Sequence, residues 1–200
     1  MGFLTDYEED AVVYDGKRYT LDLAYDSVLN VKRMYQDSKL EEVTKLEAAL
    51  EILLDPPGQA SRLSLKSAGE LLEIIFEEKI IEKPRNVVPS SPVRLVDFEL
   101  DGEYIYASFL QDYGIDLIEQ QGKMGWKKFL ALFDGLSEKT KMREVMKIRG
   151  MELPRPNRFN QKEIQRLQEL KAYYALPVRG NGGKEGLDRL WGVLERMAKG

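Results

Sequence analysis

The sequence contains neither cysteine nor histidine among its 200 residues. The lack of cysteine excludes disulfides, thiolate nucleophiles and Cys/His zinc sites, and the lack of histidine excludes Ser-His-Asp triads and imidazole acid–base catalysis. Carboxylates, Lys, Tyr and Ser remain for catalysis, but the same side chains cover most solvated surfaces. Composition therefore favours a binding or structural protein over an enzyme, and it predicts no metal or cofactor.

Long apolar runs are also lacking. No stretch approaches the roughly 18 apolar residues of a membrane-spanning helix, and residues 1–10 are acidic where a secretory signal would be basic and then apolar. The chain is 43% hydrophobic and 32% charged, which is enough apolar material to form a core. We expect a soluble cytoplasmic protein that does not interact with a membrane.

The charges are unevenly distributed along the chain. Residues 1–83 contain 10 Lys or Arg and 18 Asp or Glu, whereas residues 84–200 contain 20 and 16. This pattern is compatible with an ordinary mixed-charge surface. It also suggests a sharper hypothesis, in which the acidic half of one copy meets the basic half of the next in a head-to-tail assembly.

The acidic region, residues 1–83, is predicted to contain a β-hairpin followed by helices. Asp15-Gly16 lies between β-prone runs, which is typical of a tight turn with positive φ. Asp26 is a predicted helix cap. The helical spacing of apolar residues predicts three helices, over residues 26–35, 40–53 and 65–81.

A proline-rich segment, residues 84–92, predicts a linker between this region and a helical C-terminal region, residues 93–178. Ser137 and Asn160 are predicted caps for the last two helices of that region. Its four expected helices cover residues 104–113, 126–135, 138–149 and 160–174. The fold class that these patterns predict is mainly α, a helical bundle with a small N-terminal β-hairpin.

The last segment, residues 179–200, combines a glycine-rich tether with a short amphipathic helix. This helix either packs back on its own domain or docks on a partner. Its apolar residues are the candidate partner-contact residues: Leu187, Leu190, Trp191, Leu194 and Met197.

Three other segments contain residue types that also occur in known kinds of binding site. Residues 97–102 imitate the start of a calcium-binding loop, but the twelfth position is Ser108 instead of Glu, so we expect a solvated acidic lead-in. Residues 122–129 interleave basic and aromatic residues as nucleic-acid binders do, yet Trp126 and Phe129 have the spacing of a core helix. The aromatic residues between 104 and 113 are expected to pack. No catalytic, cofactor-binding or metal-binding residue is predicted.

Four long blocks of the sequence have a recognisable pattern: Leu4–Asp37, Tyr104–Leu136, Lys141–Pro154 and Leu170–Pro177. Together they resemble a bacteriophage family known as gene product fifteen, found in siphophages and prophages of Gram-positive bacteria. The resemblance implies a gene between those of the major tail protein and the tape-measure protein, the usual place of tail assembly chaperones. The family has no catalytic or binding motif to transfer to this sequence.

The resemblance implies a largely helical protein that self-associates as a homo-oligomer and binds the tape-measure protein during virion morphogenesis. Such a chaperone works in the host cytoplasm and is absent from the mature virion, and the major tail protein is a further candidate partner. Two alternatives stay open. One is a structural virion component, such as a tail-completion or connector protein, and the other is a nucleic-acid-binding phage regulator, which the thin positive charge disfavours.

Overall fold

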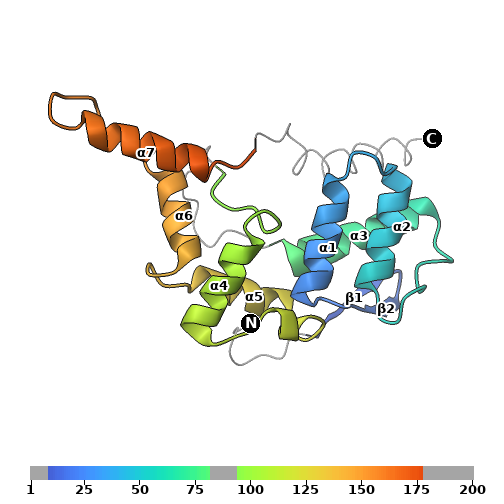
Figure 1. Cartoon of the computed structure of the whole chain (residues 1–200). Helices are drawn as coiled ribbons and strands as arrows, with labels where there is room; N and C mark the ends of the chain where they lie inside the picture. Colours follow the sequence, from blue (N-terminus) through green and yellow to red (C-terminus); the bar gives the residue numbers. More distant parts are fainter. Residues whose placement is uncertain (1–8, 82–93, 178–200) are drawn as a thin grey trace. The chain divides into compact units, whose positions relative to one another are not determined.

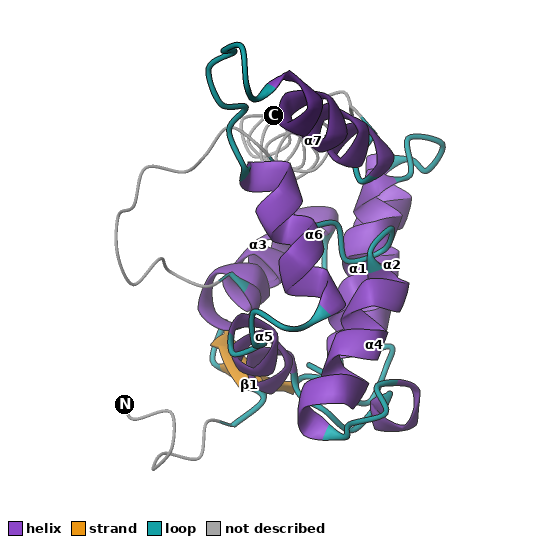
Figure 2. Cartoon of the chain, turned by 60° about the vertical axis from the view of Figure 1, so that its left-hand side comes forward, coloured by secondary structure: helices purple, strands orange, loops and turns teal. Residues whose placement is uncertain are grey.

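The computed structural model describes residues 9–81 and 94–177 of the chain (Figure 1). Over these residues the protein is mainly α-helical, with seven α-helices and one two-stranded antiparallel hairpin (Figure 2). The predicted fold class is therefore confirmed. No helix within the two described ranges combines the length and the apolar character that crossing a bilayer requires.

The chain divides into two compact units. Of the described residues, unit one contains 9–81 and 121–128, and unit two contains 94–120 and 129–177. The predicted linker at 84–92 and the predicted tether and helix at 179–200 lie outside the described residues. Unit one is discontinuous in sequence, because a short segment from the basic half of the chain joins the acidic N-terminal part.

A hairpin begins the described part of unit one. Its strands, β1 (Ala11–Tyr14) and β2 (Lys17–Thr20), pair in antiparallel fashion. The turn residues Asp15 and Gly16 have φ angles of 48° and 69°, the left-handed conformation that a tight two-residue turn requires. Val12 and Tyr19 lie opposite each other and are both buried, so one face of the hairpin packs on the helices.

Three α-helices and a π-helical turn follow the hairpin: α1 (Tyr25–Gln36), α2 (Glu42–Leu53), α3 (Leu65–Ile75) and η1 (Phe76–Ile80). Their apolar faces form the core of unit one, whose fully buried side chains include Val28, Leu50, Leu53, Leu71, Leu72 and Ile75. The predicted cap of α1 is wrong, because Asp26 lies in the first turn of the helix. Asp22 instead accepts hydrogen bonds from the Ala24 N–H and the Ser27 hydroxyl.

Residues 121–128 complete unit one beside the start of α1. The Trp126 N–H donates to the Leu23 carbonyl at 2.7 Å, and the Tyr25 N–H donates to the Met124 carbonyl at 2.9 Å. The Trp126 side chain is 2% exposed, and its indole N–H donates to the Ile80 carbonyl at 3.0 Å. The predicted burial of Trp126 is therefore confirmed, and the core that it joins is that of unit one.

Unit two is built from helices and one 3-10 turn: α4 (Gly102–Tyr113), η2 (Ile118–Gln120), α5 (Trp126–Asp134), α6 (Lys141–Gly150) and α7 (Gln161–Tyr173). Its core includes a cluster of phenylalanine rings. The rings of Phe109 and Phe129 stack with centroids 5.3 Å apart, and Phe98 lies 5.3 Å from Phe133. Phe129 is buried as predicted, so α5 contributes Trp126 to unit one and Phe129 to unit two.

The predicted cap of α6 is wrong, whereas α7 has its N-cap at the predicted residue but without a side-chain hydrogen bond to the helix. Helix α6 begins at Lys141 with Thr140 as its N-cap, and Ser137 is held by hydrogen bonds to the Asp112 carboxylate. Asn160 does precede α7, but its side chain accepts a hydrogen bond from the Asn157 N–H instead of capping the helix. Short polar side chains bond equally well to nearby loop groups, so a cap residue by itself does not decide where a helix begins.

Candidate interaction surface

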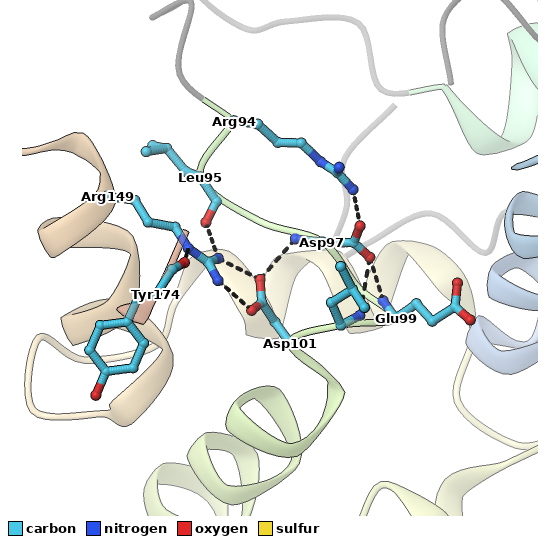
Figure 3. Close-up of polar contacts among 8 residues, drawn as sticks. Arg94, Leu95, Asp97, Glu99, Asp101, Arg149 and Tyr174 are labelled. Carbon is cyan, nitrogen blue, oxygen red and sulfur yellow. Dashed lines mark hydrogen bonds and ion pairs between the residues drawn. The ribbon is translucent and has the colours of Figure 1, made fainter. Parts of the chain in front are cut away.

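A buried ion pair organises the polar interior of unit two (Figure 3). The Arg149 guanidinium donates to the two carboxylate oxygens of Asp101 at 2.6 and 2.7 Å. Its Nε donates to the Tyr174 carbonyl at 2.7 Å, and a second bond from Nη1 reaches the Leu95 carbonyl at 2.8 Å. One side chain of α6 therefore ties together the segment before α4 and the residue after α7.

The carboxylate of Asp97 is also satisfied by protein groups. It accepts hydrogen bonds from the Glu99 and Leu100 N–H groups at 3.0 and 3.1 Å, and it forms an ion pair with Arg94. Asp97 is 4% exposed and Asp101 is 1% exposed, so the expectation of a solvated acidic lead-in is wrong. These two acids are buried because arginines and backbone N–H groups compensate their lost hydration. Within 9–81 and 94–177 no group of three acidic side chains is arranged to hold a metal ion.

Lys171 attaches the C-terminal end of α7 to the end of α6. Its ammonium donates to the carbonyls of Ile148, Arg149 and Met151 at 3.1, 2.7 and 2.7 Å. The last carbonyls of a helix have no partner within the helix and carry partial negative charge. A lysine from α7 therefore acts as the C-terminal cap of α6.

Tyr174 provides the second attachment of the same end of α7. Lys141, the first residue of α6, donates to the Tyr174 hydroxyl at 2.8 Å and to the Glu144 carboxylate at 2.9 Å. The hydrogen bond to Tyr174 has the larger effect and that to Glu144 the smaller, and together they raise the pKa of Lys141 above its ordinary value. The ring of Tyr104 lies edge-on to Tyr174 at 6.1 Å. The attachments of α7 to the rest of unit two thus gather at its C-terminal end.

Helix α7 and the loop before it form what we name the arm, residues 151–173. No residue of α7 is buried, and its apolar stripe of Ile164, Leu167 and Leu170 is only half-buried. Figure 1 shows α7 extending past α6. Phe159 is 97% exposed and Tyr173 is 77% exposed. An amphipathic helix of this length gains most of its stability by burying its apolar face, so the arm has the character of an incomplete packing surface.

The arm also presents positive charge. Four exposed basic side chains occupy its middle, Arg155, Arg158, Lys162 and Arg166, against a single acid, Glu163, between residues 155 and 166. No hydrogen bond or ion pair joins these four side chains to another described residue. The surface therefore combines exposed aromatic groups with uncompensated cations, which is typical of sites that contact another protein.

The sequence had indicated a different place for partner contact. The candidate residues Leu187, Leu190, Trp191, Leu194 and Met197 lie outside the described residues, so they stay a prediction. The helical spacing over residues 160–174 correctly predicted α7. One feature of the sequence could have indicated an exposed arm. It is the loop with Pro154 and Pro156, which separates α7 from α6.

The remaining aromatic residues of α4 pack as expected. The Tyr113 hydroxyl donates to the Leu132 carbonyl at 2.9 Å, and the Tyr106 hydroxyl donates to Asp116 at 3.0 Å. Hydrogen bonding to Asp116 raises the pKa of Tyr106. These hydroxyls therefore have structural partners within unit two.

Comparison with known protein families identifies a matching family. The family model described as Bacteriophage Gp15 protein matches residues 6–176, which include the whole arm. No curated protein and no solved structure matches the chain. Because the family model covers most of the chain, the protein belongs to the bacteriophage Gp15 protein family and is a phage structural or morphogenesis protein.

Proposed function

We propose that this protein is a tail assembly chaperone, which self-associates and binds the tape-measure protein during tail morphogenesis without catalysing a reaction. The observation that carries the proposal is the arm, where exposed aromatic side chains and uncompensated cations lie on α7 and on the loop before it, and the helix is attached at one end. A chaperone for a long helical partner needs many copies joined by weak, reversible contacts. A half-covered amphipathic helix supplies such a contact.

Two different contacts are required in this function, one between copies and one with the tape-measure protein. We assign the copy-to-copy contact to the arm, since it lies within the residues that the family model matches. We assign the tape-measure contact to the C-terminal segment, whose candidate residues are Leu187, Leu190, Trp191, Leu194 and Met197. The protein then acts in the host cytoplasm and leaves before the virion is complete.

The first experiment is co-expression with the tape-measure protein encoded in the same phage genome, with purification and light scattering of the complex. We expect the full chain to co-purify in several copies per tape-measure molecule. A chain lacking residues 180–200 should lose this co-purification and keep its circular dichroism spectrum. Failure of the full chain to co-purify would contradict the proposed function.

A second measurement separates the chaperone from a structural component of the virion. Mass spectrometry of purified phage particles should detect the major tail protein and the tape-measure protein but not this chain. Its presence at a fixed ratio to the tail proteins would instead support a tail-completion or connector protein. Steeply salt-dependent binding to DNA or RNA would support the regulator.

A further inference from the structure

A surface that covers the arm has to complement its chemistry. Its basic residues Lys162 and Arg166 are four residues apart on α7, so they project from the same face of the helix about 6 Å apart along its axis. Phe159 adds a nearly fully exposed aromatic ring just before the helix begins. A complementary surface carries acids at a similar spacing beside exposed apolar groups.

Unit one carries such a surface on α3 and η1. Glu73 and Glu77 are also four residues apart, and Glu70 lies one turn before them on the same face. The only basic residues of this helical stretch are Lys66, at its start, and Lys79, whose ammonium is bound to the Glu9 carbonyl at 3.0 Å. We name Glu70, Glu73 and Glu77, with the half-exposed Ile81 that follows them, the acidic face.

The carboxylates of the acidic face lie close enough together to influence one another. Partial burial is the main cause that raises the pKa of Glu73, and the charges of Glu77 and Glu70 raise it further. Like charges on neighbouring helical turns destabilise the helix that bears them. Glu73 and Glu77 form no hydrogen bond or ion pair with other described residues, so their charges are open to a partner.

We propose that the arm of one copy docks on the acidic face of a second copy, with Lys162 and Arg166 against Glu73 and Glu77 and with Phe159 covering apolar surface beside them. This inference rests on the proposed function, because it specifies the self-association that a chaperone needs. The two surfaces are different, so the contact is heterologous and each added copy offers a new arm or a new acidic face. Successive copies can therefore extend along a long partner.

The occupant is a second copy for two reasons. The complementary charges and their matching spacing are both present on this chain, so a solution of the purified protein contains everything that the contact requires. The arm also lies within the residues that the family model matches, 6–176, which contain the acidic face as well. The test distinguishes this contact from two others. In one the arm binds the tape-measure protein, and in the other it binds the acidic face of its own chain.

The test uses two charge-reversed forms of the full chain. The arm variant carries R158E, K162E and R166E, and the face variant carries E70K, E73K and E77K. Each is measured by light scattering and sedimentation over a range of concentrations. The wild-type chain should self-associate, and each variant alone should raise the dissociation constant at least about a hundredfold, because attraction becomes like-charge repulsion.

Mixing the two variants is the decisive step. In the mixture, the negatively charged arm of the arm variant can bind the positively charged face of the face variant. The unchanged arm of the face variant can bind the unchanged face of the arm variant. An equimolar mixture should therefore regain the assembly that each variant alone lacks. The matched control carries K39E, R62E and K128E, three exposed basic residues outside the arm, and should assemble like wild type. Circular dichroism of each variant reports whether its helices are retained.

Several outcomes would overturn the proposal. A wild-type chain that stays monomeric at high concentration contradicts it, as does an arm variant that still assembles. A mixture of folded variants that stays monomeric places the partner of the arm elsewhere, on the tape-measure protein or within the same chain. Assembly is measured on the purified chain alone, so a failure to bind the tape-measure protein refutes the proposed function and leaves this contact standing.

Salt provides an independent measurement of the same contact. Raising the ionic strength from about 0.05 M to about 0.5 M shortens the screening length severalfold. Wild-type self-association should weaken at least about tenfold over this range, because both surfaces are exposed. Assembly that is unchanged or stronger at high salt would show an apolar contact without charge pairing, and would overturn the assignment of these residues.

Discussion

Arg149 of α6 and Asp101, the residue before α4, form a two-pronged ion pair in the interior of unit two although 48 residues separate them in sequence. Their side chains are only 6% and 2% exposed. The planar guanidinium matches the two carboxylate oxygens, which compensates the loss of water around both charges. The same guanidinium also reaches the Tyr174 carbonyl, so this pair connects the attachment of the arm to the core.

Replacing Arg149 by Ala should strongly destabilise unit two. The change leaves the Asp101 carboxylate buried without its counter-charge, and we expect the free energy of unfolding to fall by about 3–5 kcal/mol. Urea denaturation followed by circular dichroism measures the effect. The double variant R149L/D101L should be more stable than R149A, because it leaves no uncompensated charge. A loss below about 1 kcal/mol for R149A would show that the pair is not buried in solution.

Replacing Lys171 by Met should release α7 without unfolding the rest of unit two. The change removes three charge-assisted hydrogen bonds to the end of α6, which we expect to lower the local stability of α7 by about 1–3 kcal/mol. Hydrogen exchange measured by mass spectrometry should show faster exchange over residues 161–173 and unchanged exchange in α4. The Q168M variant, altered on the same helix at an exposed position outside the proposed contact, is the control. Equal protection of α7 in K171M and wild type would contradict this account of its attachment.

Replacing Tyr35 by Phe should stabilise unit one. The buried Tyr35 hydroxyl has no hydrogen-bond partner within the described residues, so its removal should raise the free energy of unfolding by about 0.5–1 kcal/mol. The ring contact with Phe76, at 6.3 Å, does not depend on the hydroxyl. Thermal and urea denaturation at neutral pH measure the change, and a loss of stability would indicate that the hydroxyl has a bound water.

The Y35F substitution should also change how the free energy of unfolding depends on pH in the alkaline range. Burial, and then the charge of Glu42, raise the pKa of Tyr35 above its ordinary value of 10.0. In the wild-type chain the unfolded state therefore loses this proton at lower pH than the native state, and stability falls as the pH rises above about 10. The advantage of Y35F over wild type should grow in that range. A constant difference across pH would contradict the raised pKa.

Replacing Glu73 by Gln should stabilise the monomer at neutral pH. Partial burial and the charges of Glu77 and Glu70 raise the pKa of Glu73 above its ordinary value of 4.5, so the native state binds its proton more tightly than the unfolded state does. Wild-type stability from this group is then greatest below pH 4.5 and falls as the pH rises through the native pKa. The gain in E73Q should therefore be present near pH 7 and shrink in acid.

The measurement on E73Q is a pH series of urea denaturation at a protein concentration low enough to avoid self-association. The control is E47Q, which alters an exposed acid on α2 away from the acidic face. A gain that is the same at pH 4 and pH 7 would contradict the electrostatic explanation. Added salt should reduce the gain, because the acidic face is largely exposed.

Local signals in the sequence were sufficient for the secondary structure. Asp15-Gly16 specifies a tight turn because its residues tolerate positive φ, and the hairpin forms there. The 3.6-residue spacing of apolar side chains gave each described helix its place, to within a few residues at the ends. The caps Asp26 and Ser137 failed, because nearby donors in the folded chain compete for the same short side chains.

These local signals did not predict contacts between residues that are far apart in the sequence. Asp97 and Asp101 have the residue types of a solvated acidic segment, and only the approach of α6 brings Arg149 to Asp101. Trp126 and Phe129 have the spacing of a core helix, but no local feature indicates that residues 121–128 join the N-terminal unit. Likewise, the pattern of α7 shows an apolar face, and a periodicity does not reveal whether another segment covers it.

The amino-acid sequence by itself determined the absence of thiol and imidazole chemistry, the helical class, the hairpin and the family. These follow from residue types and from spacings within a few turns, which act on the chain before it is folded. Tertiary structure decided that two acids are buried against arginines, that a segment of the basic half completes unit one, and that the described residues cover only part of the apolar face of α7. The physical reason is that hydration is lost or kept according to which surfaces meet, and this depends on residues far apart in the chain.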